Sequence, residues 1–97
     1  MTINKKQDGE NLCIALEGRL DTSTAPELEA AVSNLDGIKN LEFDFEKLEY
    51  VSSAGLRVLL ATQKVMNSQG GMKITHVNET IMEVFEITGF ADILSIE

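Results

Sequence analysis

The chain has 97 residues, which is enough for one domain (1–97) but not for two. Its formal net charge of −8 argues against nucleic acids and anionic membrane surfaces as partners, because both attract basic patches. With one cysteine and one histidine, Cys13 and His76, the chain cannot form an internal disulfide or a Cys/His zinc site, and no metal is expected.

The apolar segments are all short. None approaches the roughly 20 apolar residues that a membrane-spanning helix needs, and residues 1–10 lack the apolar core of a signal peptide. We therefore expect a cytoplasmic protein that does not insert into membranes. An acidic surface without an obvious exposed apolar stripe favours a monomer.

The N-terminal segment predicts a β-hairpin. Asp8–Asn11 carries turn residues, so residues 3–7 are expected to form an edge strand that pairs with the apolar run Leu12–Leu16. That run is nearly continuous and ends before Gly18, which is typical of a strand buried on both faces. Cys13 lies within it and is expected to be a small buried hydrophobe.

A helix and a second strand are predicted next. Thr24 and Glu27 have the spacing of a capping box, and Pro26 suits a first helical turn. Apolar residues at helical spacing then extend this helix as far as Leu35. The segment Leu41–Phe45 alternates apolar and acidic residues, which indicates a strand.

The C-terminal half predicts two further helices around a strand. Residues 56–66 form a mostly buried helix that is followed by a short strand at 72–76. Asn78 is expected to cap a last helix, and Gly89 is expected at its C-terminal end. Residues 94–96 can add a terminal strand, so the predicted order is β-β-α-β-α-β-α-(β).

Two serines precede the helix at 56–66, in the stretch Tyr50–Arg57, which reads YVSSAGLR. A serine at a helix start can accept an orphan backbone N–H, worth roughly 1 kcal/mol. A phosphate at a helix N-terminus would be stabilised by roughly 0.3–1 kcal/mol, and Gly55 permits close backbone approach. The residues alone leave two alternatives open for Ser52 and Ser53, a structural cap only or a modified switch.

Catalytic motifs are missing. The sequence has no Gly-x-Gly-x-x-Gly, no P-loop, no His-Glu-x-x-His and no Gly-x-Ser-x-Gly. His76 falls at a predicted strand end and is assigned to the surface. Carboxylates such as Glu29 and Glu83 are assigned to solvated helix faces. We therefore expect neither an enzyme nor a cofactor.

Several motifs, taken in order over essentially the whole chain, resemble a known family. They are Gly18-Arg19-Leu20-Asp21 with Thr24-Ala25, the strand Leu41–Phe45, the helix start Ser52-Ser53-Ala54-Gly55-Leu56, and Val84–Phe90. In this order and spacing they resemble the anti-sigma factor antagonists, which are small stand-alone STAS domains.

The resemblance implies a fold and a function. The fold would be α/β, a single STAS-like domain with a mixed four- to five-stranded sheet and α-helices packed on it. The chain would bind an anti-sigma factor that is also a serine kinase of the histidine-kinase-like ATPase type, and so regulate sigma-factor-dependent transcription. Phosphorylation of a serine at the helix start would release it, and a metal-dependent Ser/Thr phosphatase would reset the switch.

Alignment on Gly55-Leu56 carries the phosphoacceptor onto Ser53, with Ser52 as the alternative. Many family members have an aspartate at the Ser52 position. Asp21 matches the family's turn aspartate, which is expected beside the acceptor, and Asp44 matches its strand-end Asp or Asn. The partner-binding residues implied are Asp21, Thr22, Ser23, Thr24, Asp44, Ser52, Ser53, Ala54, Gly55 and Arg57.

Two other functions are weighed. The same fold could serve as a STAS subunit of a membrane transport complex or sensory assembly, where the helix-start serine would only be a cap. A small phosphoryl or acyl transferase would need a nucleophile–base pair, and no such constellation supports it.

Overall fold

The elements follow the predicted order with one addition, in a computed structural model that describes all 97 residues. They are β1 (Thr2–Asp8), β2 (Asn11–Leu20), α1 (Ala25–Ala31), β3 (Asn40–Val51), α2 (Ser53–Asn67), β4 (Gly71–Thr75), α3 (Glu79–Thr88) and the short 3-10 helix η1 (Phe90–Asp92). The predicted terminal strand is reduced to an isolated parallel bridge between Ile96 and Ile74. None of the helices combines the length and apolar character that a membrane crossing requires.

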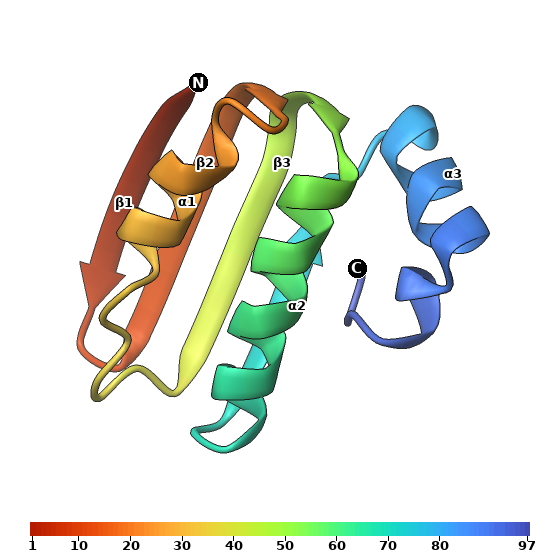
Figure 1. The fold of residues 1–97 in the computed structure, drawn as a ribbon. Coiled ribbons are helices and arrows are strands. Elements are labelled where there is room, and N and C mark those ends of the chain that lie inside the picture. The colour runs from red at the N-terminus through yellow and green to blue at the C-terminus, as the bar shows by residue number, and fades with distance from the viewer.

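The sheet is mixed, as predicted. Its four strands lie in the order β1-β2-β3-β4, with β1 antiparallel to β2 and the other two pairs parallel. Gly9 closes the β1–β2 hairpin with a φ of 61°, which glycine adopts without steric cost. Because β2 and β3 are parallel, their carboxyl ends meet at one edge of the sheet (Figure 1).

All three helices pack on one face of the sheet (Figure 1), and the other face is uncovered. Leu12, Ile14 and Leu16 of β2 point into the core, whereas Cys13 and Ala15 between them are only half-buried. The predicted burial of this strand on both faces is therefore wrong, and so is the expectation that Cys13 is buried. Small apolar residues on the open face made the run look continuous.

Helix α1 differs from its prediction at both ends. Thr24 occupies the N-cap position but makes no capping hydrogen bond, so the predicted capping box is wrong. Pro26 does lie in the first turn. The helix ends at Ala31, and Leu35 enters the core from the following loop rather than from the helix. Leu35 is buried all the same, so its spacing indicated a core position but not the extent of the helix.

Strand β3 is much longer than the predicted Leu41–Phe45. Two register shifts against β2 place one extra residue each in β3, the first between Asp44 and Lys47 and the second between Leu48 and Tyr50. These bulges put the buried residues Phe45, Leu48 and Val51 three apart. The period of two ends at Phe45, so the sequence pattern hid the second half of the strand.

The last two helices are close to prediction. The Asn78 side chain accepts a hydrogen bond of 2.8 Å from the Ile81 N–H, and Gly89 ends α3 with a φ of 80°.

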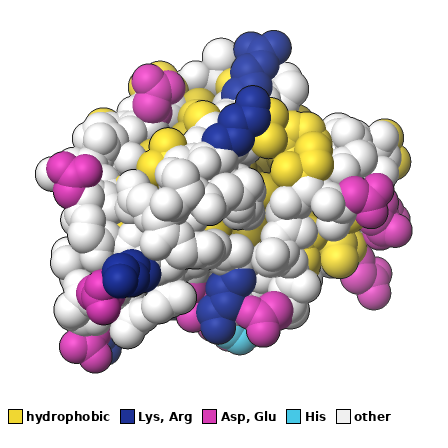
Figure 2. Space-filling view, turned by 90° about the horizontal axis from the view of Figure 1, so that it is seen from below, with side chains coloured by type: hydrophobic (Ala, Val, Ile, Leu, Met, Phe, Trp, Pro, Cys, Tyr) yellow, Lys and Arg dark blue, Asp and Glu magenta, His cyan; other side chains and the backbone are white.

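Some apolar side chains reach the surface of the domain, and Figure 2 shows a group of them between the basic and the acidic side chains. Val65, Ile87 and Ile93 are the large exposed ones. The surface is therefore not fully polar, and the monomeric state stays a prediction.

Candidate functional site

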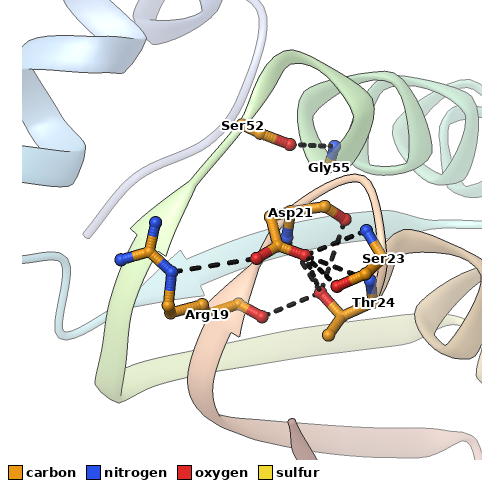
Figure 3. A network of polar contacts seen from close by, with 6 residues as sticks. All are labelled: Arg19, Asp21, Ser23, Thr24, Ser52 and Gly55. Carbon is orange, nitrogen blue, oxygen red and sulfur yellow. Dashed lines mark hydrogen bonds and ion pairs between the residues drawn. The ribbon is translucent and has the colours of Figure 1, made fainter.

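The candidate site lies where β2 and β3 end. Leu20 pairs with Val51 in the sheet, and the Ser52 N–H donates a hydrogen bond of 2.8 Å to the Leu20 carbonyl. The turn after β2 and the start of α2 therefore lie side by side (Figure 3). Strand pairing brings Asp21–Thr24 and Ser52–Ala54 together, as the resemblance implied.

Asp21 organises its own turn. Its Oδ1 accepts hydrogen bonds from the Ser23 hydroxyl at 2.7 Å, the Ser23 N–H at 3.0 Å and the Thr24 N–H at 3.2 Å. The Thr24 hydroxyl accepts from the Asp21 N–H and donates to the Arg19 carbonyl, both at 2.8 Å. The bond from the Ser23 hydroxyl, followed by the backbone N–H groups, holds the pKa of Asp21 below its usual value.

Two residues that the sequence analysis did not select flank this turn. The Arg19 guanidinium lies 3.7 Å from Asp21 Oδ2 and 4.4 Å from the centroid of the Tyr50 ring. Arg19 and Tyr50 are cross-strand partners in β2 and β3. The second half of β3, which creates this pairing, was not predicted, so the contact could not be anticipated.

The two serines have different surroundings. Ser52 is the N-cap of α2, and its Oγ accepts a long hydrogen bond of 3.4 Å from the Gly55 N–H. Ser53 is the first residue of the helix, its side chain is exposed, and its hydroxyl forms no hydrogen bond. One serine therefore caps the helix, while the other presents a free hydroxyl at the helix N-terminus.

Gly55 is a spacer. A Cβ at this position would lie 2.5 Å from Leu20 Cγ and 3.2 Å from the Leu20 carbonyl oxygen. Gly55 is buried, so it lets α2 approach the end of β2 and does not itself form part of the surface. The closeness of the two turns depends on this missing side chain.

A groove continues the site between α1 and α2. It encloses about 590 Å³ and includes the predicted partner-binding residues Thr22, Ala54 and Arg57. Its remaining lining is largely apolar and comes from Ala25, Pro26, Glu29, Val32, Ser33, Leu35, Val58, Ala61, Thr62 and Val65. Val32 and Leu35 line the groove from beyond the end of α1, and the sequence did not indicate this because their spacing predicted that the helix continued through them.

Asp44 does not join this site. It lies in the middle of β3, paired with Ala15 and Thr75, and the strand continues to Val51. Its expected place at a strand end is therefore wrong. The unpredicted length of β3, at about 3.3 Å per residue, separates it from Ser53 by roughly 20 Å.

Asp44 instead contacts His76, just beyond β4. Its Oδ1 lies 2.9 Å from His76 Nδ1 and accepts the Glu46 N–H at 3.0 Å. Partial burial pushes the pKa of Asp44 upward, but these two hydrogen bonds, together with the nearby charges of His76 and Lys47, outweigh it and the pKa is lowered. The hydrogen bond to Asp44 raises the pKa of His76.

Comparison with known proteins agrees with this fold. The STAS domain model matches residues 2–97. The anti-sigma-B factor antagonist of Bacillus subtilis is 30% identical to the chain, with 99% of this chain and 90% of that protein covered.

Solved structures share the fold. An anti-sigma factor antagonist from Mycobacterium paratuberculosis superimposes with a TM-score of 0.88 at 23% identity, covering 98% of this chain and 83% of that one. The phosphorylated form of the Bacillus cell fate determinant SpoIIAA gives a TM-score of 0.76 at 19% identity, covering 99% and 91%. With the domain model matched along almost its full length, the chain belongs to the STAS domain family.

Proposed function

We propose that this protein is an anti-sigma factor antagonist that binds its anti-sigma factor through the Asp21–Thr24 turn and the start of α2. The observation that carries the proposal is the exposed, unbonded hydroxyl of Ser53 beside an ordered turn. The apolar groove between α1 and α2 adjoins both elements and offers further contact area. The name of the Bacillus subtilis relative supports the same function.

In this proposal Ser53 is the phosphoacceptor, and the anti-sigma factor is its kinase. The Ser52 oxygen is occupied in capping α2, whereas the Ser53 hydroxyl is free to reach a nucleotide. A phosphate on Ser53 would lie at the positive end of the α2 dipole, so the domain would stay folded. That SpoIIAA has been solved in a phosphorylated form is compatible with such a switch.

The release step follows from charge. A phosphate adds about −1.5 to −2 to a chain whose net charge is −8. The helix end offsets part of this charge within the domain, but an unpaired like charge across an interface costs several kcal/mol. Since each ~1.4 kcal/mol is a factor of ten in affinity, a loss of roughly two to three decades is sufficient for release. A cytoplasmic metal-dependent phosphatase would restore binding.

Phosphopeptide analysis tests the acceptor. Protein from its native host, prepared with phosphatases inhibited, is digested with trypsin to release the peptide Leu48–Arg57. We expect the phosphate on Ser53, and its localisation to Ser52 would overturn the choice of serine. Incubation with purified kinase and ATP should modify wild type and Ser52→Ala but not Ser53→Ala.

Affinity measurements test the switch itself. Ser53→Ala should bind the anti-sigma factor about as well as wild type, and Ser53→Asp should bind at least tenfold more weakly. Equal binding by both variants would contradict electrostatic release. Absence of any anti-sigma partner, with co-purification of a transport ATPase instead, would contradict the proposed function.

A further inference from the structure

A second polar cluster lies on the uncovered face of the sheet. Asp44 and Glu46 flank the buried Phe45 in β3, and both line the same hollow on the opposite side from the core. His76 follows β4 directly, and the pairing of Asp44 with Thr75 brings it alongside. Three potential metal ligands therefore converge from two adjacent strands, on a face that the proposed partner-binding site does not use.

The ligand atoms are close enough for side-chain movements to bring them around one ion. One oxygen of each carboxylate and a ring nitrogen of His76 all lie within 4.8 Å of one another. Asp44 Oδ1 and His76 Nδ1 are 2.9 Å apart. Two ligands held at about 2.0–2.1 Å from a tetrahedral ion are separated by about 3.4 Å, so small rotations of these two side chains would let an ion replace the shared proton.

The negative charge of the cluster is not balanced by a lysine or arginine. Neither Asp44 nor Glu46 forms an ion pair with a lysine or arginine, although Lys47 is adjacent in sequence. The Glu46 carboxylate accepts no hydrogen bond at all. Two carboxylates thus face a single imidazole, while Lys73 of the neighbouring strand pairs with Glu42 and Glu97 instead.

Open space adjoins the two carboxylates. A hollow of about 200 Å³ is lined by Asp44 and Glu46 together with Asn4, Glu17 and Lys47, among others. This is enough for several water molecules, each of which occupies about 30 Å³ in the liquid. His76 does not line this hollow, so water could reach an ion in the cluster from the side of the two carboxylates.

From these observations we propose that Asp44, Glu46 and His76 form a binding site for a divalent transition-metal ion of the Zn²⁺ type. Imidazole nitrogen favours such ions over Mg²⁺ and Ca²⁺, which prefer oxygen ligands alone. No Cys/His spacing in the sequence indicated a metal site, because these three residues are brought together only by strand pairing. A bound ion would tie the middle of β3 to the β4–α3 connection and stabilise the folded state.

Calorimetric titration of the tag-free protein with zinc chloride tests the site. It is done near pH 8, above the usual histidine pKa of about 6.5, and thermal unfolding is followed with and without zinc. We expect one ion per chain and a raised Tm. His76→Gln and Glu46→Gln should each weaken binding at least tenfold, and calcium chloride should give no comparable Tm shift.

Cys13→Ser is the matched control, because the Cys13 thiol is a zinc-binding group on the same uncovered face but outside the cluster. It should bind zinc as wild type does. Loss of binding in Cys13→Ser, unchanged binding in His76→Gln, or no zinc binding by wild type would each overturn the proposal. Circular dichroism of the metal-free variants establishes that they are folded before the titrations are compared.

Discussion

Two aspartates in this domain have lowered pKa values for different structural reasons. Asp21 is stabilised by hydroxyl and N–H groups within three residues of it, in a turn that the chain forms by itself. Asp44 receives one hydrogen bond from nearby Glu46, and its other contact is to His76, 32 residues away. The first cluster is a local motif, whereas the second exists only because β3 and β4 pair.

This difference has consequences for mutation. The turn at Asp21 is packed against the start of α2 through Leu20 and Gly55, so changes there affect the fold and the proposed partner site together. The cluster at Asp44 lies on the uncovered face, with no helix packed against it. Substitutions there should weaken the proposed metal binding and have little effect on stability or on partner binding.

The largest effect is expected from Gly55→Ala. The new Cβ would lie 2.5 Å from Leu20 Cγ, and such overpacking typically costs about 1–3 kcal/mol. Gly71→Ala is the matched control, because nothing lies within 4 Å of the corresponding Cβ. Urea denaturation of both variants measures the difference. Equal stability of the two would mean that α2 and β2 are not held this closely.

Ser52→Ala should have the next largest effect. It removes the N-cap of α2, whose hydrogen bond is 3.4 Å long, so we expect a loss of about 0.5–1 kcal/mol in the free energy of unfolding. Ser53→Ala, one residue on, should change it by less than about 0.5 kcal/mol. If Ser53→Ala were the more destabilising variant, Ser53 rather than Ser52 would be the residue that caps α2.

Asp21→Asn should make stability less sensitive to acid. Because the folded pKa of Asp21 is lowered, its carboxylate contributes stability above the unfolded pKa, and this is lost as pH falls through the folded pKa. Wild type should therefore be the more stable near neutral pH, and the two proteins should converge below about pH 4. Denaturation midpoints measured across this range would show a constant offset if the hydrogen bonds of the turn did not lower the pKa.

The smallest effect on stability is expected from His76→Gln in metal-free buffer. His76 is exposed, and a surface hydrogen-bonded pair contributes little. Denaturation should give a midpoint close to wild type, and the affinity for the anti-sigma factor should also be unchanged. A large loss of stability or of this affinity would show that the Asp44 cluster is coupled to the Asp21 turn, contrary to the comparison made above.

The sequence by itself determined the features that depend on nearby residues. The element order, the Gly9 hairpin, the Asn78 cap and the Gly89 helix end were all predicted and are confirmed. Each rests on hydrogen bonds or backbone preferences within a few residues, so the local sequence contains the necessary information. The closeness of the Asp21 turn to the Ser52 helix start was expected from the family resemblance, and the parallel pairing of β2 with β3 accounts for it.

Only the tertiary structure decided which face of each strand is covered and how far β3 extends. Cys13 is half-buried because all three helices pack on the opposite face, and no local pattern records where a helix packs. The bulges of β3 interrupt its period of two and hid the second half of the strand, whose length keeps Asp44 away from the predicted site. The pairing of Asp44 with Thr75 places it beside His76. Contacts between residues far apart in the chain set these features, because strand register and helix packing are settled only when the whole core closes.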